Sequence, residues 1–421
     1  MSYEVSPRVK ATIDTLLSNE KIKKAMDFLV QDQPTRTGEN KEIALIQGET
    51  RKEALGRSPS FKERLERYGA KDCEIDGIGN AYGYIYGKES AKKSIVIMET
   101  HLDTVFMEDT PLAIIEKDGK IFCPGIGDNA SAQAQSFSIM RAMNHAGIKP
   151  VNTVMVMGAA CEEGKGNFDG MRFFLKNNDP KNFAAAVIVD GGGDSNIGWG
   201  GIGIIRITYT FKGPKGHSWH RGGDPSTIHA MGRAVAKIAE IPMIKDPKTT
   251  INVGIVSGGS TVGAVAGECM IQVDMRSSNA KLLHELAEKV ERFVQEGVAE
   301  ENAFKKERID TGVSAITVEK DIFGDMPAGE GIAGHACVQA ANYLTLALNK
   351  KPNMEGGTCT NGNITVDNGI PTVIMGHGGF NGENHSLNEW YEPLDNYIAA
   401  QRAMLTVLAL VGVEGITEPL A

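Results

Sequence analysis

Side chains of the types that bind metals or transfer protons follow three apolar segments of this sequence. The segments and the polar residues after them are SIVIME (94–99) with His101 and Asp103, TVMVMGAA (153–160) with Glu162 and Glu163, and AAAVIVD (184–190), which ends on Asp190. Two loops add to the set: GIGDNA (125–130) supplies Asp128, and GENHSLNE (382–389) supplies His385. Open parallel sheets bind ligands beyond the carboxyl ends of their strands, so we expect these side chains to cluster.

Imidazoles and carboxylates without cysteine form a ligand set that suits zinc, with cobalt or manganese as alternatives. A bridging carboxylate can hold two such ions ~3.5 to 4 Å apart, and we therefore expect two metals. In an extended segment His101 and Asp103 point to the same side, so the Asp103 carboxylate can accept the proton on the far imidazole nitrogen. Of the adjacent Glu162 and Glu163, one can bind metal while the other acts as a general base.

The prediction depends on the agreement of five segments, because each motif alone is weak. A single HxD motif or a pair of glutamates is more often a solvated surface feature. The other histidines His145, His284 and His335 lie on predicted helices or at their ends, and we interpret them as structural or surface residues. GWGGIG (198–203) has dinucleotide-binding spacing but precedes a strand and not a helix, so nucleotide binding is not expected.

The order of apolar segments predicts an α/β fold. Helical spacing dominates the first 70 residues, and from Cys73 onward short strands alternate with helices. The nearly continuous apolar runs at 94–99, 153–160, 184–190 and 371–376 are typical of strands covered on both sides. We therefore predict a mostly parallel sheet with helices on both faces.

The middle third of the chain has a different pattern. Strands are predicted at 204–211, 249–256, 269–277 and 314–320, with helices at 225–241 and 279–301. This βαβ-βαβ order is typical of a small ferredoxin-like α+β domain. We predict that it is an insertion at 205–321, and that 1–204 and 322–421 together form the domain with the metal site.

Composition excludes several classes of partner. The formal net charge of -9 argues against nucleic-acid binding, which normally requires a basic surface. No apolar run is long enough to cross a membrane, and the charged N-terminal segment does not resemble a signal peptide. The six cysteines are scattered and form no CxxC pair, which favours free thiols in a reducing compartment. We expect a cytoplasmic protein that binds neither nucleic acid nor membranes.

The polar segments also resemble those of a known family. METHLDTV (98–105), GIGDNA, ACEEG (160–164), VDGGG (189–193) and ENHSLNE (383–389), in this order, are similar to motifs of the co-catalytic zinc peptidases and acylases. That family includes peptidase T, carnosinase, aminoacylase and succinyl-diaminopimelate desuccinylase. The resemblance covers nearly the whole chain, because the middle region is similar to the family's inserted lid domain, and it implies a zinc-exopeptidase-like fold.

The resemblance implies a role for each matching residue. His101 and Asp190 would hold one zinc ion, Glu163 and His385 the other, and Asp128 would bridge them. Glu162 would be the general base and Asp103 would orient His101. In the lid, GPKGHSWH (213–220) implies that His217 polarises the scissile carbonyl in the active site of a dimer partner, and QVDMRS (272–277) implies that Arg276 binds a substrate carboxylate. The segment GGTCTNGN (356–363) implies substrate contacts by Gly357 and Asn361.

The sequence departs from the family pattern near these residues without replacing a metal ligand. Thr100 and Ser131 stand where glycine is usual, Gly263 and Ala266 replace an asparagine and a proline, and Asn361 replaces an aspartate. These changes affect the prediction of the substrate more than that of catalysis. Aspartate at position 190 resembles the aminopeptidases and dipeptidases, whereas glutamate is commoner in the acylases.

We therefore expect an exopeptidase that cleaves short peptides, of the aminopeptidase or di/tripeptidase type, with Glu162 activating the water between two metals. An N-acyl amino-acid amidase or deacylase is the alternative within the hydrolases. A metal-binding relative without activity is the third possibility. The resemblance also implies a homodimer formed through the lid domain.

Overall fold

The computed structural model describes residues 5–87 and 94–421, and the chain divides into two compact units. The first contains residues up to Gly201 and from Glu330 onward, and the second contains Ile202–Gly329. The predicted insertion at 205–321 ends earlier than the second unit. The reason is that the last strand of this unit, β15 (Thr317–Met326), continues beyond the predicted 314–320 and pairs with the first strand as far as Ile204.

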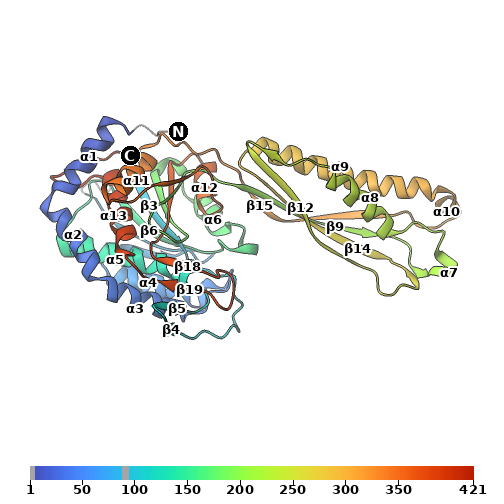
Figure 1. Ribbon diagram of the computed structural model, residues 1–421, viewed down its shortest axis with the longest axis horizontal. Coiled ribbons are helices and arrows are strands. Elements are labelled where there is room, and N and C mark those ends of the chain that lie inside the picture. Colours follow the sequence, from blue (N-terminus) through green and yellow to red (C-terminus); the bar gives the residue numbers. More distant parts are fainter. Residues whose placement is uncertain (1–4, 88–93) are drawn as a thin grey trace. The chain divides into compact units, whose positions relative to one another are not determined.

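The first unit contains a mostly parallel sheet of eight strands in the order β1-β2-β6-β3-β7-β17-β8-β16 (Figure 1). Its parallel centre consists of β6, β3, β7 and β17. The strands are β1 (Lys71–Ile75), β2 (Ala81–Ile85), β3 (Ile95–His101), β6 (Val154–Ala159), β7 (Phe183–Val189), β8 (Asn196–Gly198), β16 (Asn353–Glu355) and β17 (Thr372–Met375). The four predicted apolar runs are the four strands of this centre, as expected for strands that lie between two layers of helices.

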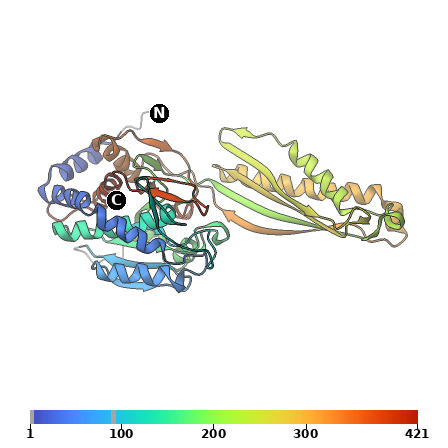
Figure 2. The same cartoon turned by 60° about the horizontal axis from the view of Figure 1, so that its bottom comes forward.

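Helices cover both faces of this sheet (Figure 2). The helices are α1 (Pro7–Ser18), α2 (Glu20–Gln31), α3 (Gln33–Ala44), α4 (Arg57–Arg67), α5 (Ser131–Ala146), α6 (Asp169–Asn177), α11 (Ala336–Ala347), α12 (Gly362–Asp367) and α13 (Tyr397–Val411). A single apolar core joins α5, α11 and α13 to alternate strand residues such as Val96 and Met98. The helices α6 and α12 pack on the opposite face of the sheet. Met171 and Phe174 of α6 are therefore buried but do not belong to that core.

A small antiparallel sheet of four strands, which the sequence analysis did not predict, brings two distant loops together. Its order is β18-β19-β5-β4, with β4 (Ile115–Lys117), β5 (Lys120–Phe122), β18 (Phe380–Gly382) and β19 (Trp390–Glu392). The loop after β5 contains Asp128, and the loop between β18 and β19 contains His385. Because β19 pairs with β5, these two loops are held next to each other.

The second unit is an α+β sandwich with the strand order β11-β12-β14-β9-β15, antiparallel throughout. Its longer elements are β9 (Gly203–Lys212), α8 (Thr227–Ala239), β12 (Lys248–Gly258), β14 (Glu268–Ser277), α9 (Ala280–Phe304) and β15, with the shorter β10 (Gly216–His217), α7 (Ser218–Arg221), β11 (Ile244–Lys245), β13 (Ala264–Val265) and α10 (Lys306–Asp310). The first and third long strands lie in the centre, which is the ferredoxin-like arrangement. Both long helices pack on one face, on buried residues such as Ile207 and Val273.

Candidate metal centre

The carboxyl ends of three neighbouring strands place the predicted ligands at one edge of the large sheet. His101 is the last residue of β3, and its partner in register, Ala159, is the last residue of β6, which precedes Glu162 and Glu163. Asp190 directly follows β7, the neighbour of β3 on the other side. The loops from the small sheet add Asp128 and His385. All five predicted ligands therefore lie at the same edge, as the strand order requires.

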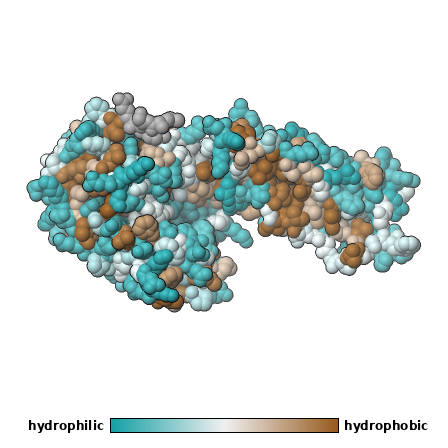
Figure 3. Space-filling model, viewed as in Figure 1, coloured by the Kyte–Doolittle hydropathy of each residue, from teal (hydrophilic) through white to brown (hydrophobic). Residues whose placement is uncertain are grey.

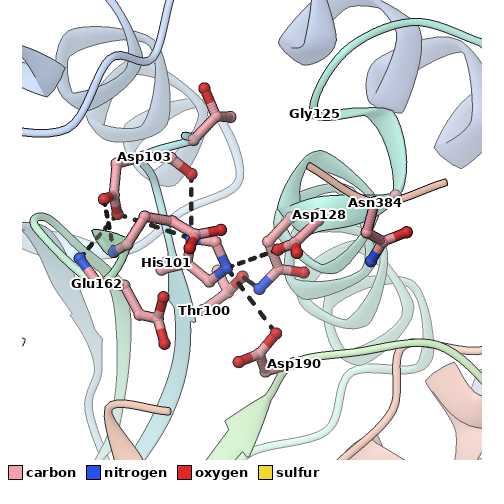
Figure 4. Close-up of polar contacts among 12 residues, drawn as sticks. Thr100, His101, Asp103, Gly125, Asp128, Glu162, Asp190 and Asn384 are labelled. Carbon is pink, nitrogen blue, oxygen red and sulfur yellow. Dashed lines mark hydrogen bonds and ion pairs between the residues drawn. The ribbon is translucent and has the colours of Figure 1, made fainter. Parts of the chain in front are cut away.

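Asp128 lies between the two histidines. Its Oδ1 is 3.0 Å from Nε2 of His101, and its Oδ2 is 3.2 Å from Nε2 of His385. The first histidine also faces Asp190, with Nε2 3.8 Å from Oδ1 (Figure 4). The second faces Glu163, with Nε2 3.1 Å from Oε1. One carboxylate thus serves two groups of ligand atoms, each with one imidazole nitrogen and carboxylate oxygens.

These separations fit tetrahedral metal coordination. Ligands about 2.0 Å from a central zinc ion lie about 3.3 Å from one another, and the four distances around Asp128, Asp190 and Glu163 range from 3.0 to 3.8 Å. His101, Asp128 and Glu163 also offer ligand atoms that all lie within 4.8 Å of one another. The residues present therefore fit metal binding in both type and spacing.

The electrostatics of the cluster also favour bound cations. Glu162 and Glu163 are buried and Asp190 is partly buried, and loss of solvent raises the pKa of each carboxyl, while the nearby histidines act in the opposite direction. Asp190 reaches a pKa of about 6. Hydrogen bonds with Asp128 and Glu163 raise the pKa of His385 to about 10. A divalent cation would supply positive charge that offsets the mutual repulsion of these carboxylates.

The Asp103 carboxylate faces His101, as predicted, and also holds the backbone of the next strand end. The Nδ1 of His101 lies 3.6 Å from Oδ1 of Asp103 and 3.1 Å from the backbone oxygen of the same residue. The carboxylate also accepts the backbone N–H groups of Glu162 and Glu163, each at 2.9 Å (Figure 4). Burial alone would raise the pKa of Asp103, but its contacts with His101 and these N–H groups lower it. Asp103 thus fixes the turn that carries both glutamates.

Two further acidic residues, which the sequence analysis did not identify, hold the backbone of the site. The fully buried Glu389 accepts the N–H groups of Gly125, Gly127 and Asp128 at 2.9 to 3.0 Å. Glu53 is 1% exposed and its Oε1 accepts the N–H groups of Arg51 and Cys161. A buried carboxylate that binds several N–H groups is difficult to distinguish from a solvated one in a sequence. The closeness of Glu389 to His385 was the only available signal.

We expect Glu389→Ala to weaken metal binding by about 10- to 100-fold, because the loop that carries Asp128 loses the acceptor of three backbone N–H groups. A competition titration with a zinc-sensitive dye measures this change. Glu389→Gln is the matched control, since its amide oxygen can still accept two of these hydrogen bonds, and it should keep most of the affinity. Wild-type affinity in the alanine variant would show that Glu389 does not position the ligand.

The four predicted substrate-contact residues lie on other elements. Asn361 is 1% exposed and donates a hydrogen bond of 2.8 Å to Glu99, whose pKa burial raises to about 8. Gly357 lies just after β16, beside the bridge between Thr358 and Gly201. His217 and Arg276 belong to the second unit, where Arg276 pairs with Asp274 at 2.8 Å. Substrate contacts by these four residues stay predictions.

Comparison with known proteins identifies the family. The model of peptidase family M20/M25/M40 matches residues 97–410. Aminopeptidase PepT from Bacillus cereus superposes with a TM-score of 0.71 at 19% identity, covering 90% of this chain and 99% of that protein. Human carnosine dipeptidase 1 gives 0.64 at 14% identity, covering 91% and 97%. A Bacillus subtilis relative, N-formyl-4-amino-5-aminomethyl-2-methylpyrimidine deformylase, is 26% identical over 74% of this chain and 78% of its own.

The structural matches agree in fold, and the family match covers most of the sequence, including every strand end that carries a predicted ligand. The Bacillus subtilis YXEP protein, described as a dinuclear metal binding peptidase, gives a TM-score of 0.64 at 14% identity and covers 89% of this chain and 98% of its own. The chain therefore belongs to peptidase family M20/M25/M40 and is a hydrolase that acts on peptide or amide bonds.

Proposed function

We propose that this hydrolase is a metal-dependent exopeptidase that cleaves short peptides, of the aminopeptidase or di/tripeptidase type. The observation that carries the proposal is the position of Asp128, whose two oxygens face His101 and His385. A shared carboxylate of this kind suits two ions ~3.5 to 4 Å apart. Asp190 and Glu163 complete the two sets of ligands.

The proposed cofactor is a pair of zinc ions, with cobalt or manganese able to replace them. His101 and Asp190 would hold one ion, Glu163 and His385 the other, and Asp128 both. When bound, the ions supply positive charge that polarises a carbonyl and lowers the pKa of water. The absence of cysteine from the cluster favours these ions over softer metals.

Glu162 is the proposed general base. It is 7% exposed and lies next to Glu163, and burial raises its pKa well above the usual range. A carboxylate in such a position can take a proton from the attacking water and return it to the leaving amine. Asp103 supports this role, because its carboxylate fixes the backbone of Glu162.

An N-acyl amino-acid deacylase is the second candidate. It is favoured by two relatives whose names describe the removal of an acyl group. One is the deformylase. The other is an acetylornithine deacetylase from Myxococcus xanthus, which is 26% identical over 24% of this chain and 31% of its own. Two observations favour the peptidase: aspartate at position 190, and structural neighbours such as a Staphylococcus aureus tripeptidase. That structure has a TM-score of 0.69 at 18% identity over 89% of this chain and 97% of its own.

Paired substrates separate the two candidates. We expect metal-replete protein to hydrolyse free dipeptides such as Leu-Gly with a kcat/KM at least about tenfold above that of N-acetyl-Leu-Gly, because a peptidase site has room for a free amine next to its acidic ligands. Chromatography of the released glycine measures both rates. Preference for an N-acyl amino acid such as N-acetyl-leucine over every free dipeptide would establish the deacylase instead.

We also propose a homodimer formed through the second unit, in which His217 contributes to the partner's active site. His217 is exposed, and Figure 3 shows apolar side chains gathered on the surface of this unit. The exposed apolar residues of the unit include Ile255 and Val256 on β12 and Trp219, which is 86% exposed. Exposed apolar groups of this kind are typical of protein interfaces. Full activity in a monomer would contradict the proposal.

The cytoplasmic location stays a prediction, supported by six free cysteines. No helix in the described ranges has the length and apolar character needed to cross a membrane.

A further inference from the structure

A cavity of about 590 Å³ opens beside the candidate metal centre, within the first unit. Its walls are the loop 49–52, the segment after β3 with Val105 and Met107, and the turn 163–165. Glu163, a proposed metal ligand, is itself part of the lining. A substrate group bonded to a carbonyl at the metal centre can therefore reach this cavity directly.

The loop 49–52 is fixed to the residues of the site. Thr50 donates a hydrogen bond of 2.9 Å to Oδ2 of Asp103, and Glu53 joins the N–H groups of Arg51 and Cys161. The backbone oxygen of Gly48 accepts the N–H of Thr104 at 2.7 Å. This wall is thus rigidly connected to the turn with Glu162 and Glu163. It lies outside residues 97–410, so it is a part of the site that the family match does not cover.

The lining combines apolar side chains with charged ones of both signs. Val105 and Met107 are 37% and 60% exposed and supply the apolar part of the lining. The charge of Arg51 is balanced by Asp169 at 2.6 Å, and that of Lys52 by Glu49 and Glu108. Lys165 is exposed, and no carboxylate in residues 5–87 or 94–421 forms an ion pair with its ammonium group.

We propose that this cavity binds an apolar group on the acyl side of the scissile bond, and that Lys165 excludes cationic groups from it. The proposal rests on the proposed function and on the predicted contact of Arg276 with a substrate carboxylate, which belongs to the leaving side of the scissile bond. Val105 and Met107 contact an extended alkyl chain, and the uncompensated ammonium repels a second positive charge. The preferred N-terminal residues are therefore leucine, methionine and norleucine, and lysine is disfavoured.

Norleucyl-glycine and lysyl-glycine test the proposal, because their side chains differ only by the terminal ammonium group. We expect the wild-type protein to prefer norleucine about tenfold in kcat/KM, and Lys165→Glu to remove or reverse this preference. Lys176→Glu, on the exposed surface of α6, makes the same change in net charge outside the cavity and should keep the wild-type ratio. Equal ratios in all three proteins would overturn the proposal.

Met107→Ala tests the apolar contact. We expect it to lower kcat/KM for norleucyl-glycine about fivefold and to leave alanyl-glycine nearly unchanged, because only the longer side chain reaches position 107. Equal losses on both substrates would count against the cavity. Hexanoyl-glycine and 6-aminohexanoyl-glycine repeat the comparison without an α-amine, so they show whether the alkyl group belongs to an amino acid or to a simple acyl chain.

Binding separates this proposal from the proposed function. The dissociation constants of norleucyl-glycine and lysyl-glycine are measured by calorimetry on the metal-loaded Glu162→Gln protein, where turnover does not interfere. Absence of hydrolysis by the wild-type protein would contradict the exopeptidase, whereas the same preference in binding would still support the cavity. Equal dissociation constants for the two peptides would reject the cavity whatever the protein hydrolyses.

Discussion

Glu162→Gln should reduce turnover by about a thousandfold while the protein keeps all of its bound metal. Glutamine has the size and shape of glutamate but cannot take a proton, so the variant lacks only the proposed base. The link between Glu162 and Asp103 runs through the backbone N–H and survives the substitution. Dipeptide hydrolysis under saturating zinc measures turnover, and mass spectrometry of the metal content measures the ions per chain.

Glu288→Gln is the matched control for this variant, because Glu288 is exposed on α9 and the change in charge is the same. It should behave as the wild-type protein in both measurements. Retained turnover in Glu162→Gln would reject the assignment of the base. Loss of metal together with turnover would mean that Glu162 is a ligand, which would reverse the proposed roles of the two adjacent glutamates.

Asp128→Ala should remove most of the bound metal, all measurable activity and the thermal stabilisation that metal provides. Asp128 faces both histidines, so its loss affects both proposed ion positions. An ion at 100 times its dissociation constant stabilises a folded protein by about 2.7 kcal/mol. We expect the wild-type Tm to rise by several degrees with zinc and that of the variant to stay nearly constant.

Differential scanning calorimetry with and without zinc measures this difference, and Asp109→Ala provides the control. Asp109 is exposed and lies outside the cluster, so its variant should respond to zinc as the wild-type protein does. An Asp128→Ala protein that still binds two ions per chain would show that this carboxylate does not bridge them. A lower Tm in the metal-free variant than in the metal-free wild type would identify a separate folding defect.

The large sheet and the position of the site were predictable from the sequence because of where polar residues stand relative to apolar runs. The runs that became β3, β6 and β7 are apolar on both faces, and a predicted metal ligand stands within four positions of the end of each run. Such an order leaves few alternatives, since parallel strands place their carboxyl ends at one edge. The helices on both faces follow from the same runs.

The parts that were missed depend on contacts between distant residues. The closeness of Glu389 to His385 does not reveal that its carboxylate binds the N–H groups of Gly125 and Gly127, which are more than 260 positions away. The short strands β18 and β19 carry too few apolar residues to be recognised by alternation. Local spacing predicted that the Asp103 carboxylate faces His101, but it did not show that the same carboxylate accepts the N–H groups of the turn after β6. Pairings of this kind require the folded chain.

A crystal structure of the zinc-loaded protein, with anomalous difference maps at the zinc edge, tests the metal centre most directly. We predict two peaks in each chain, about 3.5 to 4 Å apart. One should lie between His101 and Asp190, the other between Glu163 and His385, and both should be in contact with Asp128. A single peak, or two peaks that do not share Asp128, would contradict the proposed dinuclear centre.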